Sequence, residues 1–452
     1  MTSTGRASSW SGPREVPPDT GLPPARIAEI MSEELRGLGP PVFPMALQPL
    51  VVPPQSFREL LSATAGLVAL LHKAVRNAAA GRDGRIDALG IDRADCPFFV
   101  PDEDFELRHC ADMARADVVI AADGPKFIEI NVSGAVGGLA DMGAYHRGWR
   151  RIAGQAGRRP FAGVDIWPLL AALVKRTCAE LGTVPSAVIV DHFSDVDPTN
   201  KPRTMRLQVD GLSEHGVRAQ HLDPADLLSG IGLSGIGLSG QLREPLGLIE
   251  FDLADAREAG CDLGPVRVAL DAGFVAIPSQ TSWLLHSKKT LAWLSEGQPW
   301  MSRAERALAD RYLPWTRTVG DRAVSWRGRR YDLPRLLTEH RESFVLKGAT
   351  GCSGKEVVFG AGTDAGDWAR QVERAVRTGY PVAQEVVVPD TTPVDVLLES
   401  GETVRVAANS VVSPFCIGGV PAGCHARFAP SGPPGLVRVA DGAVLTCLLT
   451  EI

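Results

Sequence analysis

Three polar side chains near residue 129 have the types and spacing that could hold a divalent metal ion. Residues 127–131 have the sequence FIEIN, and the two-residue period of a strand places Glu129 and Asn131 on one face and the isoleucines on the other. The turn-prone linker ADGP precedes this run. A hairpin centred on its glycine puts Asp117 across from Asn131, with Arg115 two residues along. Two carboxylates and an amide oxygen are hard ligands, which suits Mg²⁺ bridging the phosphates of a nucleotide.

The simplest alternative is a half-exposed hairpin whose polar face meets water, and it would explain a bare Glu-x-Asn. Two features weaken that interpretation. Asp117 falls in register with the pair, and the run SGAVGG at 133–138 supplies a flexible turn with exposed amides beside the ligands.

A lysine followed by a glycine-rich turn forms the second candidate. Residues 344–360, FVLKGATGCSGKEVVFG, place Lys347 at the end of an apolar strand, before a turn that contains Gly351 and Gly354. This is not a P-loop, because an alanine replaces the first glycine, Glu356 replaces the Ser/Thr that binds magnesium, and a strand follows instead of a helix. We expect a hairpin lid whose backbone N–H groups bind phosphate. An ordinary glycine hairpin explains the segment alone equally well.

Three further residues of this region stay unassigned. Cys352 has no histidine or aspartate at a spacing that would activate a nucleophile, so it is not expected to act as one. Lys355 could reach phosphate from the turn or be a solvated lysine at its tip, and whether His425 takes part is open.

An apolar run late in the chain could contact a nucleotide base. The sequence YPVAQEVVVP at 380–389 is interrupted only by Gln384 and Glu385. As a hinge, its backbone groups near Val387 would meet adenine, with the carboxylate of Glu385 available to the exocyclic amine or the ribose. As a buried strand, it would need no ligand.

The order of these motifs resembles the circularly permuted carboxylate-amine ligases of the ATP-grasp superfamily, such as the synthetase half of glutathionylspermidine synthetase. In an ordinary ATP-grasp chain the lysine, the glycine-rich loop and the hinge precede the Glu-x-Asn pair. Here Glu129 and Asn131 precede Lys347. Arg115-x-Asp117 upstream of them resembles the family's phosphate-binding arginine and first magnesium ligand.

The resemblance implies a complete site for ATP and Mg²⁺. The metal ligands would be Asp117, Glu129 and Asn131. The run SKKTL at 287–291 resembles the family's lysine-bearing helix start, so Lys288 would contact phosphate. The nucleotide would also meet Lys347, Gly351, Gly354, Gln384, Glu385 and Val387. Catalysis would rest on Arg115 and on Arg427, which ends the run SPFCIGGVPAGCHAR.

By the same resemblance, the activity is ligation of a small-molecule carboxylate to an amine through an acyl phosphate, with release of ADP and phosphate. A small-molecule kinase on the same fold and a non-catalytic nucleotide-binding relative are the alternatives. A kinase would keep the phosphoryl group on its product. The retained Asp117, Glu129, Asn131 and Lys347 argue against a dead site. The acid and the amine cannot be identified.

The elements that must position these residues indicate an α+β protein, with a permuted ATP-grasp order and an adjacent small α/β lobe. Residues 1–25 suggest a disordered tail, 26–150 a helical layer and the metal-ligand half, and 286–452 the nucleotide-binding half with an antiparallel sheet. Between them, 151–285 alternates helices and strands, which predicts a parallel α/β substrate lobe. The repeated LSGIG at 228–237 predicts a flexible loop.

Composition excludes several classes of protein. The 452 residues are 44% hydrophobic and carry a net charge of −6, so the chain should form two or three globular lobes without a general affinity for nucleic acid. No apolar run approaches the ~20 residues that span a bilayer, and no signal peptide is evident, so we expect a cytoplasmic protein. The eight cysteines lack metal-site spacing. Homo-oligomerisation is left open.

Overall fold

The computed structural model describes residues 10, 21–35, 43–132, 136–158, 161–191, 201–232, 242, 245–351, 354, 356–432, 435, 437 and 442–451, without the side chains of 201–203. Cys352, Lys355, most of the proposed N-terminal tail and much of the LSGIG repeat lie outside these residues. In the described part of the chain, no helix has the length and apolarity that crossing a membrane requires.

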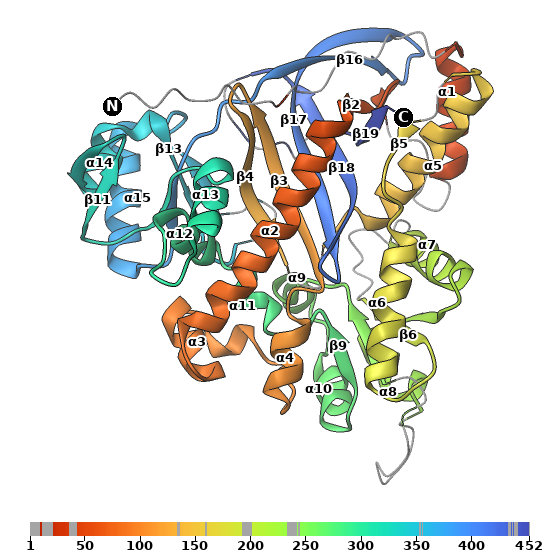
Figure 1. Ribbon diagram of the computed structural model, residues 1–452, viewed down its shortest axis with the longest axis horizontal. Coiled ribbons are helices and arrows are strands. Elements are labelled where there is room, and N and C mark those ends of the chain that lie inside the picture. The colour runs from red at the N-terminus through yellow and green to blue at the C-terminus, as the bar shows by residue number, and fades with distance from the viewer. Residues whose placement is uncertain are drawn as a thin grey trace.

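A large sheet joins the N-terminal and C-terminal thirds of the chain (Figure 1). Its β3 pairs antiparallel with both β4 and β17, so segments almost 300 positions apart become neighbours. The strands of this sheet are β1 (Met45–Ala46), β2 (Leu50–Val52), β3 (Met113–Ala121), β4 (Gly124–Asn131), β5 (Phe161–Ala162), β16 (Thr391–Leu397), β17 (Thr403–Ile417), β18 (Val420–Pro430) and β19 (Val444–Glu451).

The β3–β4 hairpin exists as expected, but its register differs from the prediction. Ala121 pairs with Gly124, and a bulge at Ile128 then shifts the ladder by one residue. Asp117 therefore lies opposite Glu129, and Arg115 opposite Asn131; the predicted pairing of Asp117 with Asn131 is wrong. The two-residue turn and the bulge together set this register, and neither is visible in the alternation of residue types.

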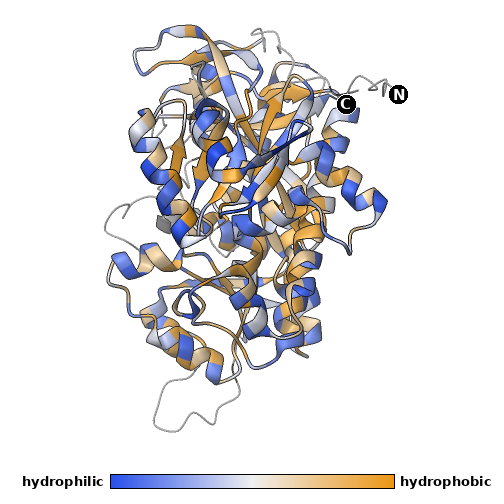
Figure 2. Ribbon diagram, turned by 90° about the vertical axis from the view of Figure 1, so that its left-hand side faces the viewer, coloured by the Kyte–Doolittle hydropathy of each residue, from blue (hydrophilic) through white to orange (hydrophobic). Residues whose placement is uncertain are grey.

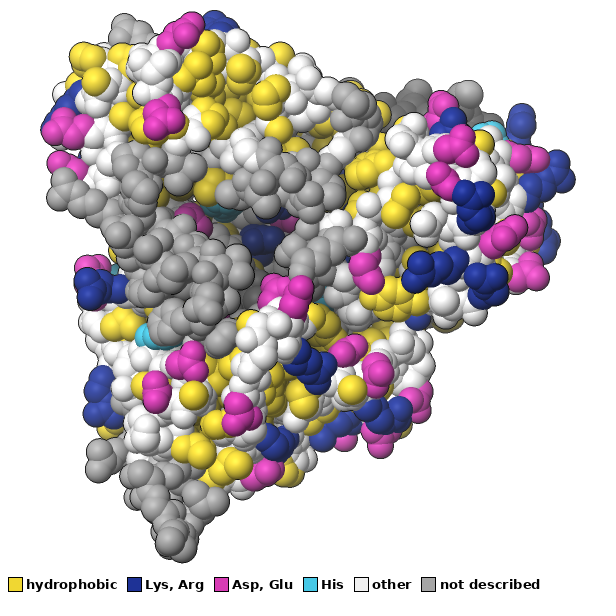
Figure 3. All heavy atoms as spheres, turned by 180° about the vertical axis from the view of Figure 1, so that it is seen from behind, with side chains coloured by type: hydrophobic (Ala, Val, Ile, Leu, Met, Phe, Trp, Pro, Cys, Tyr) yellow, Lys and Arg dark blue, Asp and Glu magenta, His cyan; other side chains and the backbone are white. Residues whose placement is uncertain are grey.

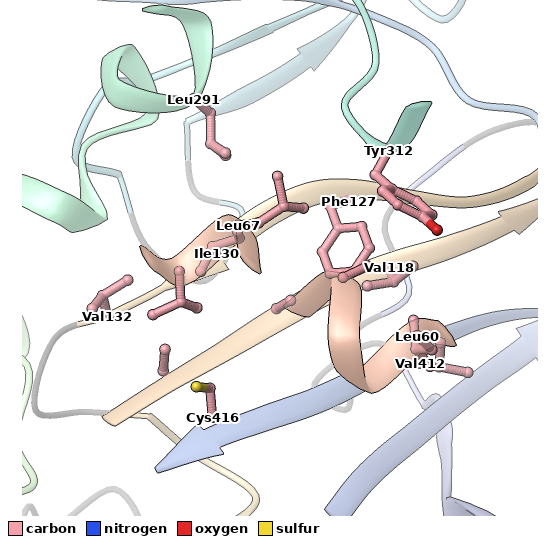
Figure 4. Close-up of a cluster of buried hydrophobic side chains, with 14 of the residues drawn as sticks. Leu60, Leu67, Val118, Phe127, Ile130, Val132, Leu291, Tyr312, Val412 and Cys416 are labelled. Atoms are coloured by element: carbon pink, nitrogen blue, oxygen red, sulfur yellow. The ribbon is translucent and has the colours of Figure 1, made fainter. Parts of the chain in front are cut away.

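Helix α2 (Pro54–Ala78) covers one face of the large sheet. It begins at the pair Pro53 and Pro54, since proline suits the first turn of a helix. Figure 4 shows Leu60 and Leu67 of α2 among Val118, Phe127 and other core side chains from β3, β4 and β17. Complete burial of a leucine such as Leu67 stabilises the fold by roughly 1.5–3 kcal/mol.

Two helices cover part of the opposite face of this sheet. Helix α5 (Leu139–Gln155) packs on β18 and β19, and α1 (Pro24–Glu34) packs on α5. The buried Trp149 donates from Nε1 to Thr446 Oγ1 of β19, 3.3 Å away. Strands β3 and β4 lie outside the part of this face that α5 and α1 cover.

A smaller antiparallel sheet and its helices form a second body, at the left of Figure 1. The predicted strands around the glycine-rich turn are confirmed. The strand order is β10 (Thr316–Thr318), β15 (Val382–Glu385), β13 (Phe344–Lys347) and β14 (Val357–Phe359). Neighbouring elements are α12 (Lys288–Glu296), α13 (Arg303–Tyr312), the hairpin β11 (Ala323–Trp326) and β12 (Arg329–Asp332), α14 (Leu333–Glu339) and α15 (Ala365–Thr378).

The predicted parallel sheet in the middle of the chain is also confirmed. Its strand order is β7 (Arg218–Leu222), β6 (Ser186–Val190), β8 (Leu246–Ile249) and β9 (Val275–Ile277). Its helices are α6 (Trp167–Glu180), α7 (Lys201–Glu214), α8 (Leu227–Gly230), α9 (Leu253–Glu258) and α10 (Gly264–Asp271). The short helix α4 (Glu103–His109) lies next to this lobe, whereas α3 (Arg82–Leu89) and α11 (Ser282–His286) pack against α2.

Hydropathy follows this layering. In Figure 2 the strands are mostly hydrophobic and the outer sides of the helices are mostly hydrophilic. The α+β class predicted from the sequence is therefore confirmed, with antiparallel and parallel sheets in separate parts of the molecule.

Candidate functional site

The predicted metal and arginine residues lie on one face of the large sheet. Strand alternation directs Ala116, Val118 and Ile130 into the core under α2, while Arg115, Asp117 and the polar residues of β4 take the opposite face. Seen from behind, Figure 3 shows a hollow in the molecule that contains basic, acidic and histidine side chains. The sequence-predicted residues from both thirds of the chain meet on this polar face.

Asp117 is the centre of a buried group of polar side chains. Its carboxylate accepts hydrogen bonds from Ser413 Oγ at 2.9 Å and from an Arg427 guanidinium nitrogen at 2.6 Å, and Arg115 Nε lies 3.5 Å away. Burial alone would raise the pKa of Asp117, but the charges of Arg115 and Arg427 outweigh it and lower the pKa to about 2. Asp117 is therefore ionised throughout the neutral range.

Glu129 faces the second pair of cations. Its carboxylate lies 3.1 Å from Lys288 Nζ. Burial acts to raise the pKa of Glu129, but the charges of Lys288 and Lys347 prevail and lower it. The charges of Lys288 and Lys347 thus both act directly on the Glu129 carboxylate.

Lys347 connects the two antiparallel sheets. From β13, its Nζ donates to the Ile128 carbonyl at 3.0 Å and to Gln384 Oε1 at 2.8 Å. Gln384 Nε2 donates to the same Ile128 carbonyl at 3.2 Å. Burial lowers the pKa of Lys347 to about 8, although Glu129 acts in the opposite direction. The ammonium is thus largely charged at neutral pH but close to its titration range.

Lys288 holds the start of the glycine-rich turn against the site. Its backbone N–H donates to Ala349 O at 2.8 Å, and its Nζ donates to Gly351 O at 2.7 Å. A Cβ at Gly348 or Gly351 would meet the carboxylate of Glu356, so a larger residue at either position would force the Glu356 side chain to move. Gly354 has φ +71°, which favours glycine.

A cavity of about 220 Å³ opens beside this turn, and Lys347, Gly348, Glu356 and Tyr380 are among its lining residues. Tyr380 donates from its hydroxyl to Glu356 Oε2 at 2.9 Å. These contacts place polar groups from the turn and from the start of the β15 segment around one space.

The predicted hinge residues separate into two environments. Gln384 is buried against Lys347, whereas the Glu385 carboxylate forms an ion pair with Arg327 at 2.7 Å on the outer side of β15. The backbone N–H of Glu385 donates to Trp315 O, and Val387 follows just beyond the strand. Arg327 is a competing partner for Glu385 that sequence reasoning did not identify.

Two buried histidines adjoin the charged groups. Burial and the nearby cations lower the pKa of His425 to about 3 and that of His286 to about 4, so both imidazoles are neutral at physiological pH. His425 lies on β18, with its ring 3.6 Å from the position that a Cβ at Gly138 would take. His286 stacks on Trp283 with ring centroids 5.1 Å apart.

The residues around Asp117 and Glu129 fit a divalent cation of the hard class. The two carboxylates are direct partners across the β3–β4 ladder, and half-buried Asn131 adds an amide two residues from Glu129. No group of three or more His, Cys, Asp or Glu with metal-site geometry occurs among the described residues. A cation here would therefore rely on two carboxylates and an amide, together with oxygens from a ligand.

Ser413, Thr316 and His286 belong to this region but were not predicted. Ser413 touches Asp117 only because β17 pairs with β3, and Thr316 Oγ1 accepts from Gln384 Nε2 at 3.2 Å only because β10 pairs with β15. Such long-range pairings leave no local spacing signal. His286 stands two residues before Lys288, and that proximity was the one available indication.

Comparisons with known proteins support the fold at low sequence identity. No protein-family model and no curated protein sequence matches this chain. The structure is similar to that of a glutathione synthetase-like effector from Globodera pallida, with a TM-score of 0.58 and 12% identity over 97% of this chain and 100% of that one. A candidate gamma-glutamylcysteine synthetase from Methylobacillus flagellatus matches with a TM-score of 0.42 and 12% identity, over 85% of this chain and 88% of that one. This chain therefore has a fold related to that of a synthetase-like protein.

Proposed function

We propose that this protein is an ATP-dependent ligase of the ATP-grasp type, which joins a small-molecule carboxylate to an amine through an acyl phosphate. The observation that carries the proposal is the meeting of four cations and two carboxylates where the two antiparallel sheets touch. Arg115, Arg427, Lys288 and Lys347 supply four positive charges, and Asp117 and Glu129 supply two negative ones, which leaves an excess of two positive charges. Such a surplus suits a polyphosphate.

Each side chain has a role in this scheme. Lys347 and Lys288 would offset charge on the phosphate oxygens, and Lys288 would keep the glycine-rich turn over them. Arg115 and Arg427 would stabilise the phosphoryl group in transfer to the substrate carboxylate, and then the oxyanion of the tetrahedral intermediate that forms when the amine attacks. Phosphate leaves as the amide bond forms.

Asp117, Glu129 and Asn131 would hold Mg²⁺. The ion would supply charge neutralisation and orientation at the β- and γ-phosphates. Arg427 forms an ion pair with Asp117 and Lys288 with Glu129, so binding of the nucleotide with its metal would exchange these ion pairs for phosphate contacts.

The permuted order of motifs is part of the proposal. Strands β3 and β4 bring the metal ligands from the first third of the chain, and β13 and β15 bring Lys347 and Gln384 from the last third. The fold shared with a synthetase-like protein supports this assignment, because that likeness covers nearly the whole chain.

The test is a screen of carboxylic acids crossed with amines, with ADP release as the first readout and mass spectrometry of the product as the second. For a productive pair, an ¹⁸O-labelled carboxylate should transfer one label to inorganic phosphate. Label in AMP would indicate an adenylate instead. A phosphorylated product without phosphate release would indicate a kinase.

A further inference from the structure

A second cavity lies where the parallel α/β lobe meets the helices that lead into the site. Its volume is about 60 Å³, several times the ~10–15 Å³ that one water needs. Figure 1 shows α4, α9, α11 and β9, which contribute to its wall, close together below the large sheet. The cavity is lined mainly by aromatic and aliphatic side chains, with three carboxylates: Asp95, Glu106 and Asp252.

The ionisable side chains that line this cavity are all acidic. No lysine, arginine or histidine is among its lining residues. Asp95 pairs with Arg257 at 3.4 Å on the surface. Within the described part of the chain, neither Glu106 nor Asp252 forms an ion pair. The lining side chains thus include acidic groups and no basic one; Asp95 is paired with Arg257, and the charge of Arg82 reaches Glu106 from outside the lining.

The carboxylate of Glu106 is already hydrogen-bonded within the protein. Its carboxylate accepts from the backbone N–H groups of Val100 and Thr281, both at 2.9 Å, and from Thr281 Oγ1 at 3.0 Å. These bonds attach the segment before α11 to α4. Glu106 shapes the cavity, and its lone pairs are largely used.

Only one of the two carboxylate oxygens of Asp252 accepts hydrogen bonds from the described residues. Its Oδ1 caps α9 by accepting from Ala254 N at 2.8 Å and Asp255 N at 3.2 Å. Its Oδ2 accepts no hydrogen bond from any described residue. A half-buried carboxylate with one uncommitted oxygen, beside an apolar wall, is suited to an ammonium group.

Aromatic rings complete the wall. Phe98 and Phe251 meet edge to face with centroids 6.2 Å apart, and Trp283 lies on the same cavity. Aromatic faces attract cations and cover the methylene groups that accompany them. Trp283 also stacks on His286, and the charges of Asp252 and Glu129 both reach that imidazole. One short helix, α11, thus contributes Trp283 to this cavity and His286 to the surroundings of the proposed phosphate site.

We propose that this cavity binds the amine substrate of the ligase as an alkylammonium ion, with Asp252 as its carboxylate partner and Trp283 and the phenylalanines around its methylene groups. This inference rests on the proposed function for the amine's role as acceptor. The binding itself is testable without ATP, because contacts within the protein position Asp252, Phe98 and Phe251.

The test is calorimetric titration of the full chain at pH 7 with n-butylamine, which is protonated there, and with butan-1-ol and butyrate as neutral and anionic matches. We expect n-butylamine to bind about tenfold or more tightly than either match. Asp252→Asn should remove that preference, because asparagine keeps the helix cap and removes the charge. The matched control is Asp364→Asn, since Asp364 caps α15 in the same way and is remote from the cavity.

A second variant guards against a change in fold. Ala276→Leu fills the cavity from β9 and should weaken n-butylamine binding without changing Mg·ATP binding. Equal binding of the three probes, or an n-butylamine affinity that both variants leave unchanged, would overturn the inference. If the ammonium preference and its loss in Asp252→Asn are seen while Mg·ATP does not bind, the cavity assignment stands and the proposed ligase function fails.

Discussion

The two carboxylates of the site are held in different ways. The Asp117 cluster (Asp117, Arg115, Ser413 and Arg427) comes entirely from β3, β17 and β18 of one sheet. The Glu129 cluster (Glu129, Lys288, Lys347 and Gln384) comes from β4 of the large sheet, from α12, and from β13 and β15 of the small sheet.

This difference separates a rigid part of the site from an adjustable one. Backbone ladders fix the distances within the Asp117 cluster, so its geometry survives any movement between the two sheets. The Glu129 cluster exists only while the sheets are docked. We therefore expect substitutions in the first cluster to lower stability as well as turnover, and those in the second to act mainly on nucleotide binding and turnover.

The largest effect should come from Glu129→Gln. Loss of this carboxylate removes a metal ligand and leaves Lys288 and Lys347 without their buried anion. We expect turnover to fall by about 10³-fold or more, with nucleotide still bound. ADP release under saturating ATP is the measurement, and Glu339→Gln, which alters an exposed pair with Arg335, is the control. Unchanged turnover would remove Glu129 from the catalytic residues.

Lys347→Ala should weaken ATP binding by roughly 10- to 100-fold, because a buried charge directed at phosphate is lost. Lys126→Ala is the matched control on the same β4 strand as Glu129, since Lys126 binds Arg311 O and Asp123 away from the site. Titration calorimetry measures the affinities, and thermal unfolding monitors the fold. A large drop in melting temperature with unchanged ATP affinity would assign Lys347 to structure alone.

Asp117→Asn should destabilise the fold, in addition to removing a proposed metal ligand. The pKa of Asp117 falls from 3.8 to about 2 on folding, which corresponds to about 2 kcal/mol of stability. Because the folded pKa is the lower one, this contribution is complete above pH 3.8 and is lost as the pH falls towards 2. Denaturant unfolding at pH 7 and at pH 2 should show a difference between wild type and variant that shrinks at the lower pH. A difference independent of pH would contradict this origin.

The smallest effect is a pH dependence of ATP affinity. Lys347 in the free protein has a pKa of about 8, and bound phosphate would favour its protonated form. Affinity should therefore decrease as the pH rises through 8, with uptake of a proton on binding. Calorimetry in two buffers of different ionisation enthalpy measures that proton, and Lys347→Ala should abolish it.

Strong local patterns allowed much of the fold to be predicted. The alternation of helices and strands over 151–285 predicted the parallel sheet, and two strands flank the glycine-rich turn as expected. Each of these depends on residues close in sequence, whose periodicity or turn chemistry is decisive.

The register and the partners of the site residues depended on contacts that no local pattern encodes. The two-residue turn and one bulged residue together placed Asp117 opposite Glu129 instead of Asn131. Ser413 met Asp117, and Arg327 met Glu385, through strand pairings and a surface loop distant in sequence. The type of residue at the site could be predicted, but its partner could not.

The carbonyl group of Ile128, at the bulge in β4, also links the two antiparallel sheets. Its single carbonyl oxygen accepts both Lys347 Nζ and Gln384 Nε2, two donors that arrive from different strands of the small sheet. Separation of the sheets would break both hydrogen bonds and leave one carbonyl oxygen without its two protein donors. The docked arrangement of the two sheets thus depends in part on a single backbone atom that two strands of the small sheet share.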